Sequence, residues 1–459
     1  MEQSGQNVIL HIGIGSFHRA HQAWYLHRLI ASGHDDWSIA AGSIRSDMSA
    51  LLECLAKQHG EYTLETVTPA GLRNYELIRS IRAIVPWDAE LAALTAAGAD
   101  ARTRIISFTV TEGGYYLDDR HKLDPRHADL VTDLEGGRVT IYGTVSAILR
   151  RRLETATGAV TLLNCDNLRS NGDRFRDGLI EFLTLRGESD LLEWMHDNAS
   201  FPNSMVDRIT PRPRDDVKAR VLAATGFDDG CPVMAESYIQ WVIEDDFRAG
   251  RPMWENVGAE IVASVLPYEE AKIRLLNATH ACIAWAGTLV GKRFIHEGTA
   301  DPSIRQIAFD YVTNDAIPCL SPSPIDLAAY RDKVLERFGN PYIEDTNQRV
   351  AADGYSKILG WVVPTLNELL ARDADVASTA ALPALFFLFL RRWHRGELPF
   401  EYQDGVMNAA SAHAIFDAPD ALEAFCAEGA LWGTLAGSPE LRDAVRRQAN
   451  AIAGQLHLR

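Results

Sequence analysis

Residues 8–19 read VILHIGIGSFHR, and this stretch sets the fold class. An apolar run ends at Ile12, and two glycines, Gly13 and Gly15, follow it. Gly13 permits a tight turn, and Gly15 lets backbone amides approach a pyrophosphate at the start of the next helix. The stretch therefore predicts a first strand, a phosphate-binding turn and a first helix.

The glycine motif is incomplete, because the third glycine of a G-x-G-x-x-G motif would stand at position 18, where this chain has His18. An ordinary glycine turn is the competing interpretation. The place of the turn, after the first strand of an α/β segment, favours nucleotide binding.

Apolar strands and amphipathic helices alternate over the first part of the chain. Beyond the strand at residues 8–12, we expect strands at 38–44, 105–110 and 160–163 and helices at 18–31, 48–57 and 145–153. Continuous apolar strands separated by helices indicate a parallel sheet that is covered on both faces.

Helical patterns dominate after about residue 267, and strand patterns nearly vanish. The expected helices are residues 269–290, 303–312, 327–338, 358–371, 382–393 and 440–452. We therefore expect an α/β fold with a Rossmann-like dinucleotide-binding domain over residues 1–266 and a mostly α-helical substrate and catalytic domain over residues 267–459. A cleft between two such domains is a natural place for a ligand.

The composition argues against several classes of protein. The chain has 459 residues, 47% of them hydrophobic, and its net charge is −17. That charge argues against nucleic acid or an anionic membrane surface as the main partner. The longest apolar run, residues 379–390, is too short to span a bilayer and predicts a buried helix. No signal sequence opens the chain, and we expect a cytoplasmic protein.

The cysteines predict neither a disulfide framework nor a metal site. The six cysteines are scattered, with no C-x-x-C pair and no Cys/His cluster at zinc spacing. We expect reduced, mostly buried thiols and no bound metal.

Residues 272–280, KIRLLNATH, carry groups that suit the oxidation of an alcohol. Without a metal, a lysine whose pKa is lowered can take the hydroxyl proton, and an amide can stabilise the developing alkoxide. At about 100° per residue of α-helix, His280 lies about 80° and Asn277 about 140° around from Lys272. All three can face one cleft. The competing interpretation is a solvated lysine on a surface helix.

The end of the second predicted strand bears on cofactor choice. Asp47 would accept hydrogen bonds from the adenosine ribose of NAD, whereas Arg45 leaves room for the 2′-phosphate of NADP. Asp47 has an alternative role as the N-cap of the helix that begins at Met48. We expect NAD rather than NADP.

Several further motifs occur in a fixed order along the chain. They are Gly13-x-Gly15-x-Phe17-His18-Arg19-x-His21, TEGGY at 111–115, NCDN at 164–167, VDRITP at 206–211, Lys272-x4-Asn277-x2-His280, and DTNQRVAADG at 345–354. Together they resemble the polyol-specific long-chain dehydrogenases, the mannitol dehydrogenase family, over about residues 8–400. Within that family the chain is most similar to bacterial members that oxidise D-arabinitol.

The resemblance implies catalytic and substrate-binding residues. Lys272 matches the general base, Asn277 and Asn167 match the residues that hold the reacting oxygen, and His280 matches a ligand of the polyol hydroxyls. Positions that line the substrate pocket are matched by Asp207, Arg349 and Lys357. Some have structural alternatives: Asp207 and Arg208 as a buried ion pair, Asn167 as a ligand of backbone groups, and His280 as a core histidine.

The resemblance also implies a gate and a cofactor site. Glu112 matches a family glutamate that gates proton traffic near the lysine. The residues expected to bind the cofactor are Gly13, Gly15, Phe17, Arg19 and Asp47.

The implied reaction is D-arabinitol plus NAD to D-xylulose plus NADH. Two alternatives within the family are a mannitol 2-dehydrogenase, which interconverts D-mannitol and D-fructose, and a hexuronate reductase, which would need an extra cation for the carboxylate. An inactive nucleotide-binding sensor is the alternative from another class, and the intact set of Lys272, Asn277 and His280 argues against it. The expected partners are small polyols and ketoses. Relatives of this family are often monomers. The sequence decides neither the oligomeric state of this chain nor the physiological direction of the reaction.

Overall fold

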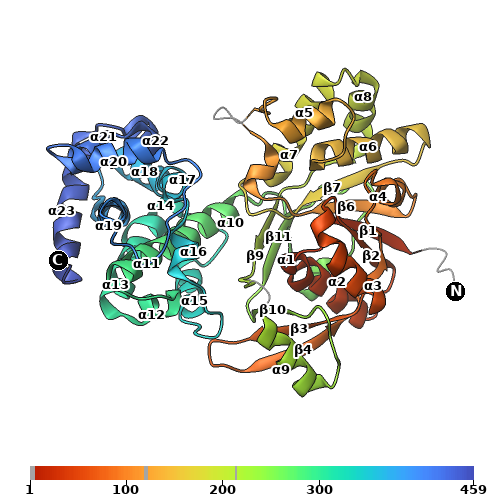
Figure 1. Cartoon of the computed structure of the whole chain (residues 1–459), viewed down its shortest axis with the longest axis horizontal. Coiled ribbons are helices and arrows are strands. Elements are labelled where there is room, and N and C mark those ends of the chain that lie inside the picture. The colour runs from red at the N-terminus through yellow and green to blue at the C-terminus, as the bar shows by residue number, and fades with distance from the viewer. Residues whose placement is uncertain (1–5, 118–121, 212–213, 459) are drawn as a thin grey trace. The chain divides into compact units, whose positions relative to one another are not determined.

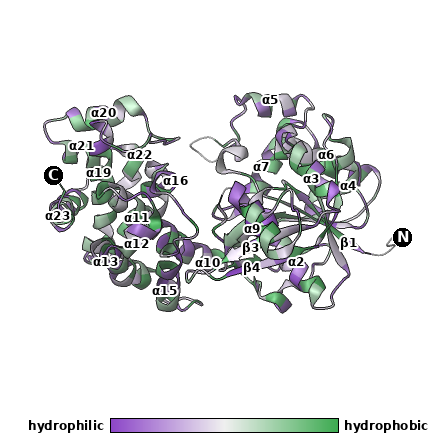
Figure 2. Ribbon diagram, turned by 60° about the horizontal axis from the view of Figure 1, so that its bottom comes forward, coloured by the Kyte–Doolittle hydropathy of each residue, from purple (hydrophilic) through white to green (hydrophobic). Residues whose placement is uncertain are grey.

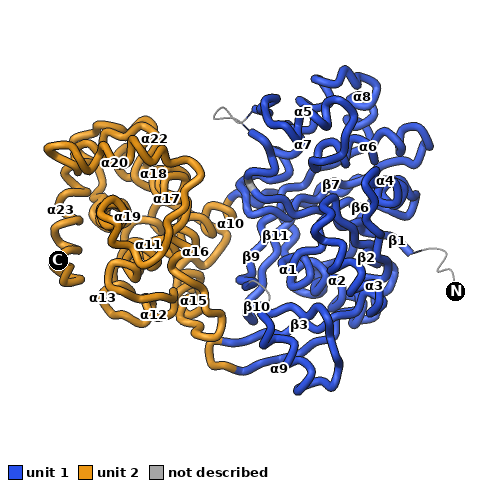
Figure 3. The backbone as a smooth tube through the Cα atoms, in the orientation of Figure 1, with its two compact units in different colours: residues 1–68, 72–266 blue, residues 69–71, 267–459 orange. Residues whose placement is uncertain are grey.

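The computed structural model describes residues 6–117, 122–211 and 214–458 (Figure 1). The chain divides into two compact units (Figure 3). Unit 1 comprises Met1–Thr68 and Leu72–Leu266, and unit 2 comprises Pro69–Gly71 and Pro267–Arg459.

In the described part of unit 1, six strands form one sheet in the order β5-β2-β1-β6-β7-β8. They are β1 Asn7–Ile12, β2 Trp37–Gly42, β5 Ile81–Ile84, β6 Thr103–Phe108, β7 Val160–Asn164 and β8 Ala199–Ser200. Every neighbouring pair is parallel. The chain adds strands on one side of β1 and then crosses to β6 on the other side, so the strand order reverses between β1 and β6. This is the Rossmann arrangement, in which ligands bind at the carboxyl ends of the strands near the reversal.

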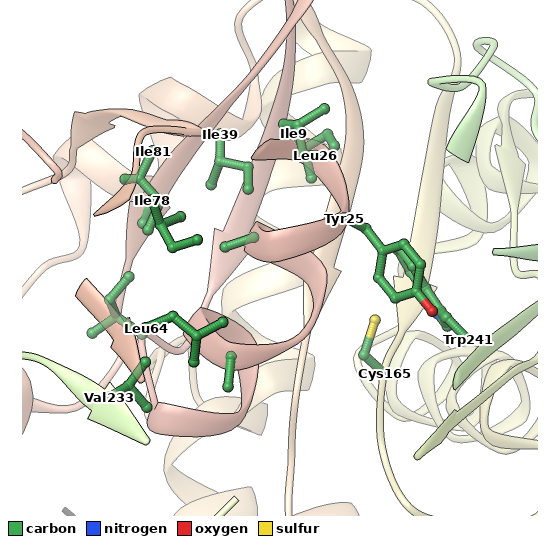
Figure 4. Close-up of a cluster of buried hydrophobic side chains, with 14 of the residues drawn as sticks. Ile9, Tyr25, Leu26, Ile39, Leu64, Ile78, Ile81, Cys165, Val233 and Trp241 are labelled. Atoms are coloured by element: carbon green, nitrogen blue, oxygen red, sulfur yellow. The ribbon is translucent and has the colours of Figure 1, made fainter. Parts of the chain in front are cut away.

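Helices cover both faces of this sheet. They are α1 Ser16–Ala20, α2 Gln22–Ala31, α3 Ser49–Lys57, α4 Ala92–Gly98, α5 Ala128–Leu134, α6 Ile141–Glu154, α7 Asn171–Leu185 and α8 Ser189–Asn198. Successive residues of a strand point to opposite faces, and Ile9 and Leu10 of β1 are both buried. Ile9 belongs to a core with Leu26 of α2 (Figure 4), and Leu10 belongs to a second core with Leu149 of α6.

Unit 1 also contains two smaller sheets, of three described strands each, that the sequence analysis missed. The first is formed by β3 Tyr62–Val67, β4 Arg73–Ile78 and β10 Val233–Glu236; the second by β9 Ser204–Asp207, β11 Gln240–Glu244 and β12 Glu260–Val262; α9 spans Asp215–Thr225. In β4 only Ile78 is fully buried, and no residue of β12 is. Strands of this kind lack the continuous apolar run that identified the central strands.

Unit 2 is helical. Its α-helices are α10 Leu266–Ala271, α11 Ala278–Leu289, α12 Ile295–Ala300, α13 Pro302–Asp310, α14 Ile317–Leu320, α15 Leu327–Phe338, α16 Asn347–Ala351, α17 Gly354–Lys357, α18 Val363–Leu370, α19 Ala377–His394, α20 Ala409–Asp417, α21 Ala421–Ala427, α22 Gly429–Trp432 and α23 Pro439–Gln455. Every residue of α11 except His280 is buried, and α11 packs against α12, α16 and α19. The parallel sheet and this helical region confirm the predicted fold class.

The apolar run at residues 379–390 is a buried part of α19, as predicted. Within the described ranges, no helix is long and apolar enough to cross a membrane. Figure 2 shows hydrophilic and hydrophobic residues mixed along the outer helices, which is typical of helices that bury one face and expose the other.

Several helices differ from their predicted form. The predicted helix at 18–31 is two helices, because the backbone of His21 leaves the helical region (φ −122°, ψ −86°) between α1 and α2. Among the described residues three segments are π-helical, all in unit 2: η4 Lys272–Asn277, η5 Tyr311–Ala316 and η6 Ile358–Val362. They interrupt or extend the helices predicted at 269–290, 303–312 and 358–371. Shorter 3₁₀ turns lie at η1 Ser46–Met48, η2 Glu112–Tyr115, η3 Trp254–Val257 and η7 Gly433–Leu435.

Candidate active site

The glycine turn of unit 1 connects β1 to α1 at the carboxyl end of the sheet. The φ angle of Gly13 is +106°, a conformation that favours glycine, and its N–H donates to the carbonyl of Gly42 at 2.8 Å. A Cβ on Gly15 would meet no atom within 4 Å, so open space lies beside this residue at the start of α1. The turn therefore fits the pyrophosphate of a dinucleotide, which needs a close backbone approach beside a helix N-terminus.

His18 occupies the position of the missing third glycine. Its ring is buried and stacks on the ring of His11 with centroids 3.4 Å apart. His11 Nδ1 lies 2.9 Å from Ser107 Oγ on β6. Burial lowers the pKa of His11 to about 3, so this ring is neutral at physiological pH. The two stacked rings thus fill the space between α1 and β1, whereas a glycine at position 18 would allow the helix and strand to pack more closely.

Phe17 and Arg19, both predicted to bind the cofactor, face different surroundings. Phe17 is partly buried and stacks on His21 at 5.0 Å. Arg19 is 2% exposed, and its guanidinium donates to the carbonyl of Cys231 and lies over the ring of Tyr62. These contacts tie α1 to β3 and to the start of β10. They favour a structural role for Arg19 over the expected contact with the cofactor.

Asp47 lies in η1, beyond the end of β2, and is bound by Arg45. Nε of Arg45 donates to Asp47 Oδ1 at 3.0 Å, and a second guanidinium nitrogen contacts Oδ2. The hydrogen bonds from Arg45 hold the pKa of Asp47 below its usual value. The alternative role of Asp47 as an N-cap is wrong, because α3 begins at Ser49 with Met48 as its N-cap and no side-chain capping bond.

A buried carboxyl joins the ends of β6 and β7. Asp166 accepts hydrogen bonds from the backbone N–H of Val110 and from Tyr115 Oη, and Asn164 Nδ2 lies 3.2 Å from Asp166 Oδ2. Burial raises the pKa of Asp166 to about 7, although these three donors act in the opposite direction. The network fixes the segment between Val110 and Tyr115 against the end of β7.

This network fixes the position of Asn167, which follows Asp166, and that of the backbone of Glu112, which lies between Val110 and Tyr115. Asn167 is exposed. The backbone of Glu112 begins η2. The side chain of Glu112, the predicted gate, lies outside the part of the chain that the structure describes.

Asp207 and Arg208 lie at the end of β9, and both are buried. Arg208 donates from Nε to the carbonyl of Glu236 at 3.0 Å and from Nη1 to the carbonyl of Ala20 at 2.6 Å. Arg208 therefore ties the second small sheet to β10 and to α1. Asp207, the predicted substrate ligand, is 5% exposed at the strand end that these bonds hold.

Lys272 and Asn277 are the first and last residues of the π-helical segment η4. Lys272 is 7% exposed, which contradicts the alternative of a solvated lysine on a surface helix. The α-helical angle expected between the two residues is also wrong, because a π turn closes i→i+5 hydrogen bonds and has a longer period. Residues five apart lie closer in direction on such a turn than on an α-helix, so η4 brings Lys272 and Asn277 nearer to one face.

The π turn is fixed by a buried tyrosine. Tyr311, the first residue of η5, is fully buried and donates from Oη to the carbonyl of Arg274 at 2.9 Å. The side chain of Arg274 binds carboxylates on both sides, Glu270 at 2.8 Å and Glu368 at 2.6 Å. A π turn disrupts the i→i+4 hydrogen bonds around it, and an outside donor to a carbonyl within it stabilises the distortion.

His280 and Arg349 meet at one carboxylate, Asp345. Nε2 of His280 lies 3.2 Å from Asp345 Oδ2, and its ring stacks on Phe338 with centroids 4.2 Å apart. Arg349 binds Asp345 with two parallel bonds, Nε to Oδ1 at 2.7 Å and Nη2 to Oδ2 at 2.5 Å. Burial lowers the pKa of His280, with the charge of Asp345 acting against this.

Lys357 ends α17 and is anchored by backbone carbonyls. Its Nζ donates to Val350 at 2.7 Å and to Ala352 at 2.5 Å, and it lies 5.4 Å from the ring centroid of Trp361. Burial lowers the pKa of Lys357 to about 8, and Arg349 is among the charges that act on it. One of its three N–H donors is left for a ligand.

Three residues near these side chains were not assigned by the sequence analysis. Asp345 stood in a motif but received no role, and Tyr311 lies in no motif. Glu269 is 3% exposed and precedes Lys272 by three positions, so a buried carboxyl stands close to the predicted base along the chain. The one available signal was an acidic residue just before the lysine. Among the described residues, no group of three His, Cys, Asp or Glu side chains is arranged to hold a metal ion.

Comparisons with known proteins cover both units. Residues 7–256 match the family described as "Mannitol dehydrogenase Rossmann domain", and residues 264–453 match "Mannitol dehydrogenase C-terminal domain". The chain belongs to the mannitol dehydrogenase family. Similar curated proteins include "D-arabinitol 4-dehydrogenase" of Ralstonia nicotianae, 63% identical over 96% of this chain and 95% of the relative. A protein of the same name from Klebsiella pneumoniae is 55% identical over 98% of this chain and 99% of the relative.

Solved structures of this family share the fold. Mannitol 2-dehydrogenase of Pseudomonas fluorescens, in a ternary complex with NAD and D-mannitol, is 34% identical with a TM-score of 0.85 and covers 99% of this chain and 94% of its own. A substrate-free D-sorbitol dehydrogenase is 30% identical with a TM-score of 0.88 and covers 99% and 98%.

Proposed function

We propose that this chain is a metal-independent polyol dehydrogenase that oxidises D-arabinitol to D-xylulose with NAD. The observation that carries the proposal is the buried Lys272, held with Asn277 on one π turn of unit 2. The reaction needs two protein groups at a fixed spacing: a base that takes the hydroxyl proton and a hydrogen-bond donor to the reacting oxygen.

In the proposed mechanism Lys272 is the general base. Burial favours the neutral form of a lysine, which is the form that accepts a proton. Lys272 Nζ takes the hydroxyl proton, and the Asn277 amide donates to the same oxygen as negative charge grows on it. Asn167, in unit 1, matches the family's other residue that holds the reacting oxygen, and this role stays a prediction. Bound NAD would supply the acceptor for the hydride that leaves the carbinol carbon.

The proposed cofactor site lies at the carboxyl end of the Rossmann sheet. Gly13 has the conformation that the turn requires, and open space lies beside Gly15. Asp47 is exposed and charged beyond the end of β2, where a carboxylate favours the free ribose hydroxyls of NAD. The Pseudomonas fluorescens relative is named as a complex with NAD, which supports the same choice.

The proposed substrate is a neutral polyol. The two relatives named D-arabinitol 4-dehydrogenase support D-arabinitol as the substrate. The interconversion of D-mannitol and D-fructose is the second candidate, because the Pseudomonas fluorescens complex contains D-mannitol. A hexuronate is less favoured, because the charge of Arg349 is already matched by Asp345. A nucleotide-binding sensor would have no need of a buried lysine on a π turn.

The test is a panel of substrates assayed with both cofactors. We expect kcat/KM to be highest for D-arabinitol, lower for D-mannitol, poor for L-arabinitol and negligible for sugar acids, since an inverted hydroxyl leaves buried donors unpaired. The kcat/KM measured with NAD should exceed that measured with NADP for each substrate. A clear preference for D-mannitol would reassign the enzyme within the family, and a preference for a hexuronate would overturn the polyol proposal.

We also propose that the enzyme works in the cytoplasm. All six cysteines are free, and four of them are buried, which suits a reducing compartment. The proposal includes no nucleic acid or membrane partner, in line with the net charge of −17.

A further inference from the structure

Asp345 lies between two residues that are predicted to bind the substrate. Its carboxylate receives both parallel bonds from Arg349 and faces His280 Nε2 at 3.2 Å. The side chain of Asp345 is 9% exposed, whereas that of Arg349 is 60% exposed. The Arg349 guanidinium therefore lies at the surface of unit 2, and the Asp345 carboxylate that neutralises its charge is buried.

The carboxylate is ionised in this setting. Burial alone would raise the pKa of Asp345, but the His280 ring and the Arg349 guanidinium hold it well below its usual value. Asp345 and Arg349 thus form a pair whose net charge is zero. A bidentate arginine–carboxylate bond also fixes the plane of the guanidinium, which limits how Arg349 can turn toward another anion.

We infer that Asp345 sets the charge selectivity of the enzyme: by occupying Arg349, it makes this surface a site for neutral hydroxyls and not for the carboxylate of a sugar acid. This inference rests on the proposed function and names what decides between polyols and acids. Two of the five N–H donors of Arg349 are used by Asp345, and the others remain for hydroxyl oxygens. Without its partner, Arg349 would present the two-pronged donor that carboxylates bind best.

Asp345 has a second effect, on His280. The Asp345 carboxylate lies 3.2 Å from Nε2 and so favours a proton on that nitrogen of the neutral ring, which leaves Nδ1 as the acceptor. A hydroxyl group can donate to such an acceptor, whereas an ionised carboxylate has no proton to give. Both neighbours of Asp345 therefore favour the same class of ligand.

The experiment compares wild type with Asp345→Asn, which keeps the size of the side chain and removes its charge. Two readouts are taken with each protein. The first is the ratio of kcat/KM for the reduction of D-fructuronate to that of D-xylulose with NADH. The second is the shift in thermal midpoint produced by gluconate and by D-arabinitol, which needs no turnover.

We expect the acid-to-neutral ratio to rise by about tenfold or more in Asp345→Asn, a scale typical of releasing a close charge pair. Gluconate should then stabilise the variant and not the wild type. The matched control is Asp443→Asn, which removes the same charge from an exposed pair with Arg442 on α23. The control should change neither readout.

A double variant, Asp345→Asn with Arg349→Gln, identifies the source of the gain. If released Arg349 binds the acid, the double variant loses the gain that the single variant shows. An unchanged ratio and an unchanged gluconate shift in a folded Asp345→Asn protein would overturn the inference. Should Asp345→Asn not fold, Arg349→Gln alone is decisive: it should lower kcat/KM for D-xylulose and leave the small kcat/KM for D-fructuronate unchanged. A fall of tenfold or more in kcat/KM for D-fructuronate would show that Arg349 already serves acids and would overturn the inference.

The failure of the proposed function would look different. A wild type that turns over no polyol or ketose, or that prefers a hexuronate, contradicts the proposed function directly. The gluconate shift would still decide whether Asp345 keeps acids away.

Discussion

At the scale of single residues, cofactor choice depends on Asp47 and on the arginine that binds it. Arg45 and Asp47 are both largely exposed, with 71% and 50% of their side chains accessible, and they bind one another. The arginine that would accept a 2′-phosphate is therefore held by the carboxylate that would repel one. The pair as a whole favours NAD.

We predict that Asp47→Ala narrows the preference for NAD over NADP, because it removes the repulsion and frees Arg45. The measurement is kcat/KM with each cofactor at saturating D-arabinitol. Asp216→Ala offers a control, since it removes an acidic side chain that binds arginines, Arg214 and Arg220, at α9. Equal use of NAD and NADP by the unmutated protein would contradict the role given to Asp47.

Among single residues, the sequence places the candidates of unit 2 close together in the chain, and their roles stay predictions. Lys272, Asn277 and His280 lie within nine positions and were found together. Asp345 joins His280 to Arg349, yet it is far from His280 in the chain, and no local pattern indicates that they meet. Arg19 shows the converse, since a motif position predicts a cofactor ligand, whereas in the fold its guanidinium donates to the carbonyl of Cys231. Its cofactor role stays a prediction.

At the scale of elements, the π turn η4 is the feature on which the site depends. Its geometry is held by the hydrogen bond from Tyr311 to the carbonyl of Arg274, and η4 packs against both other π segments, η5 and η6. Each π segment contains or adjoins a residue of this site: η4 carries Lys272, η5 begins at Tyr311, and η6 follows Lys357.

We predict that Tyr311→Phe lowers kcat for D-arabinitol oxidation by about tenfold, because η4 can relax toward an α-helix and turn Lys272 away from Asn277. The lost hydrogen bond should also cost about 1–2 kcal/mol of stability. The affinity for NAD should stay the same. A variant that loses stability but keeps its full kcat would show that Tyr311 supports packing and does not position the base.

The elements with long apolar or amphipathic patterns were predictable, and the π segments were not. A pattern of period 3.6 continues through residues 269–290, so the sequence indicates one α-helix. The extra residue of a π turn depends on partners such as Tyr311 that lie elsewhere in the chain. The two small sheets were missed for a related reason, since β4 and β12 carry no continuous apolar run and the apolar runs of β10 and β11 are only three residues long.

At the scale of the whole molecule, we propose that unit 1 binds the cofactor and that unit 2 supplies the catalytic base. Unit 1 has the Rossmann sheet with its glycine turn, and unit 2 has the π turn with Lys272 and the cluster around Asp345. The fold class and the family were predictable because motifs in both parts occur in one fixed order. The roles of the residues remain proposals that mutation must test.

We predict that removal of metal leaves the activity unchanged. Lys272 and Asn277 already supply the base and the oxygen ligand that a zinc ion would supply in other dehydrogenases. The rate of D-arabinitol oxidation should be the same before and after dialysis against EDTA. A loss of activity that zinc restores would refute the metal-independent mechanism.

We propose that Lys272 performs the chemistry on a polyol while unit 1 independently binds NAD. The most direct test is the steady-state rate of NADH formation from D-arabinitol by wild type and Lys272→Ala, on folded samples whose NAD affinity has been measured. We expect Lys272→Ala to lose about two to four orders of magnitude in kcat with an unchanged affinity for NAD. Near-normal turnover by Lys272→Ala would contradict the proposal.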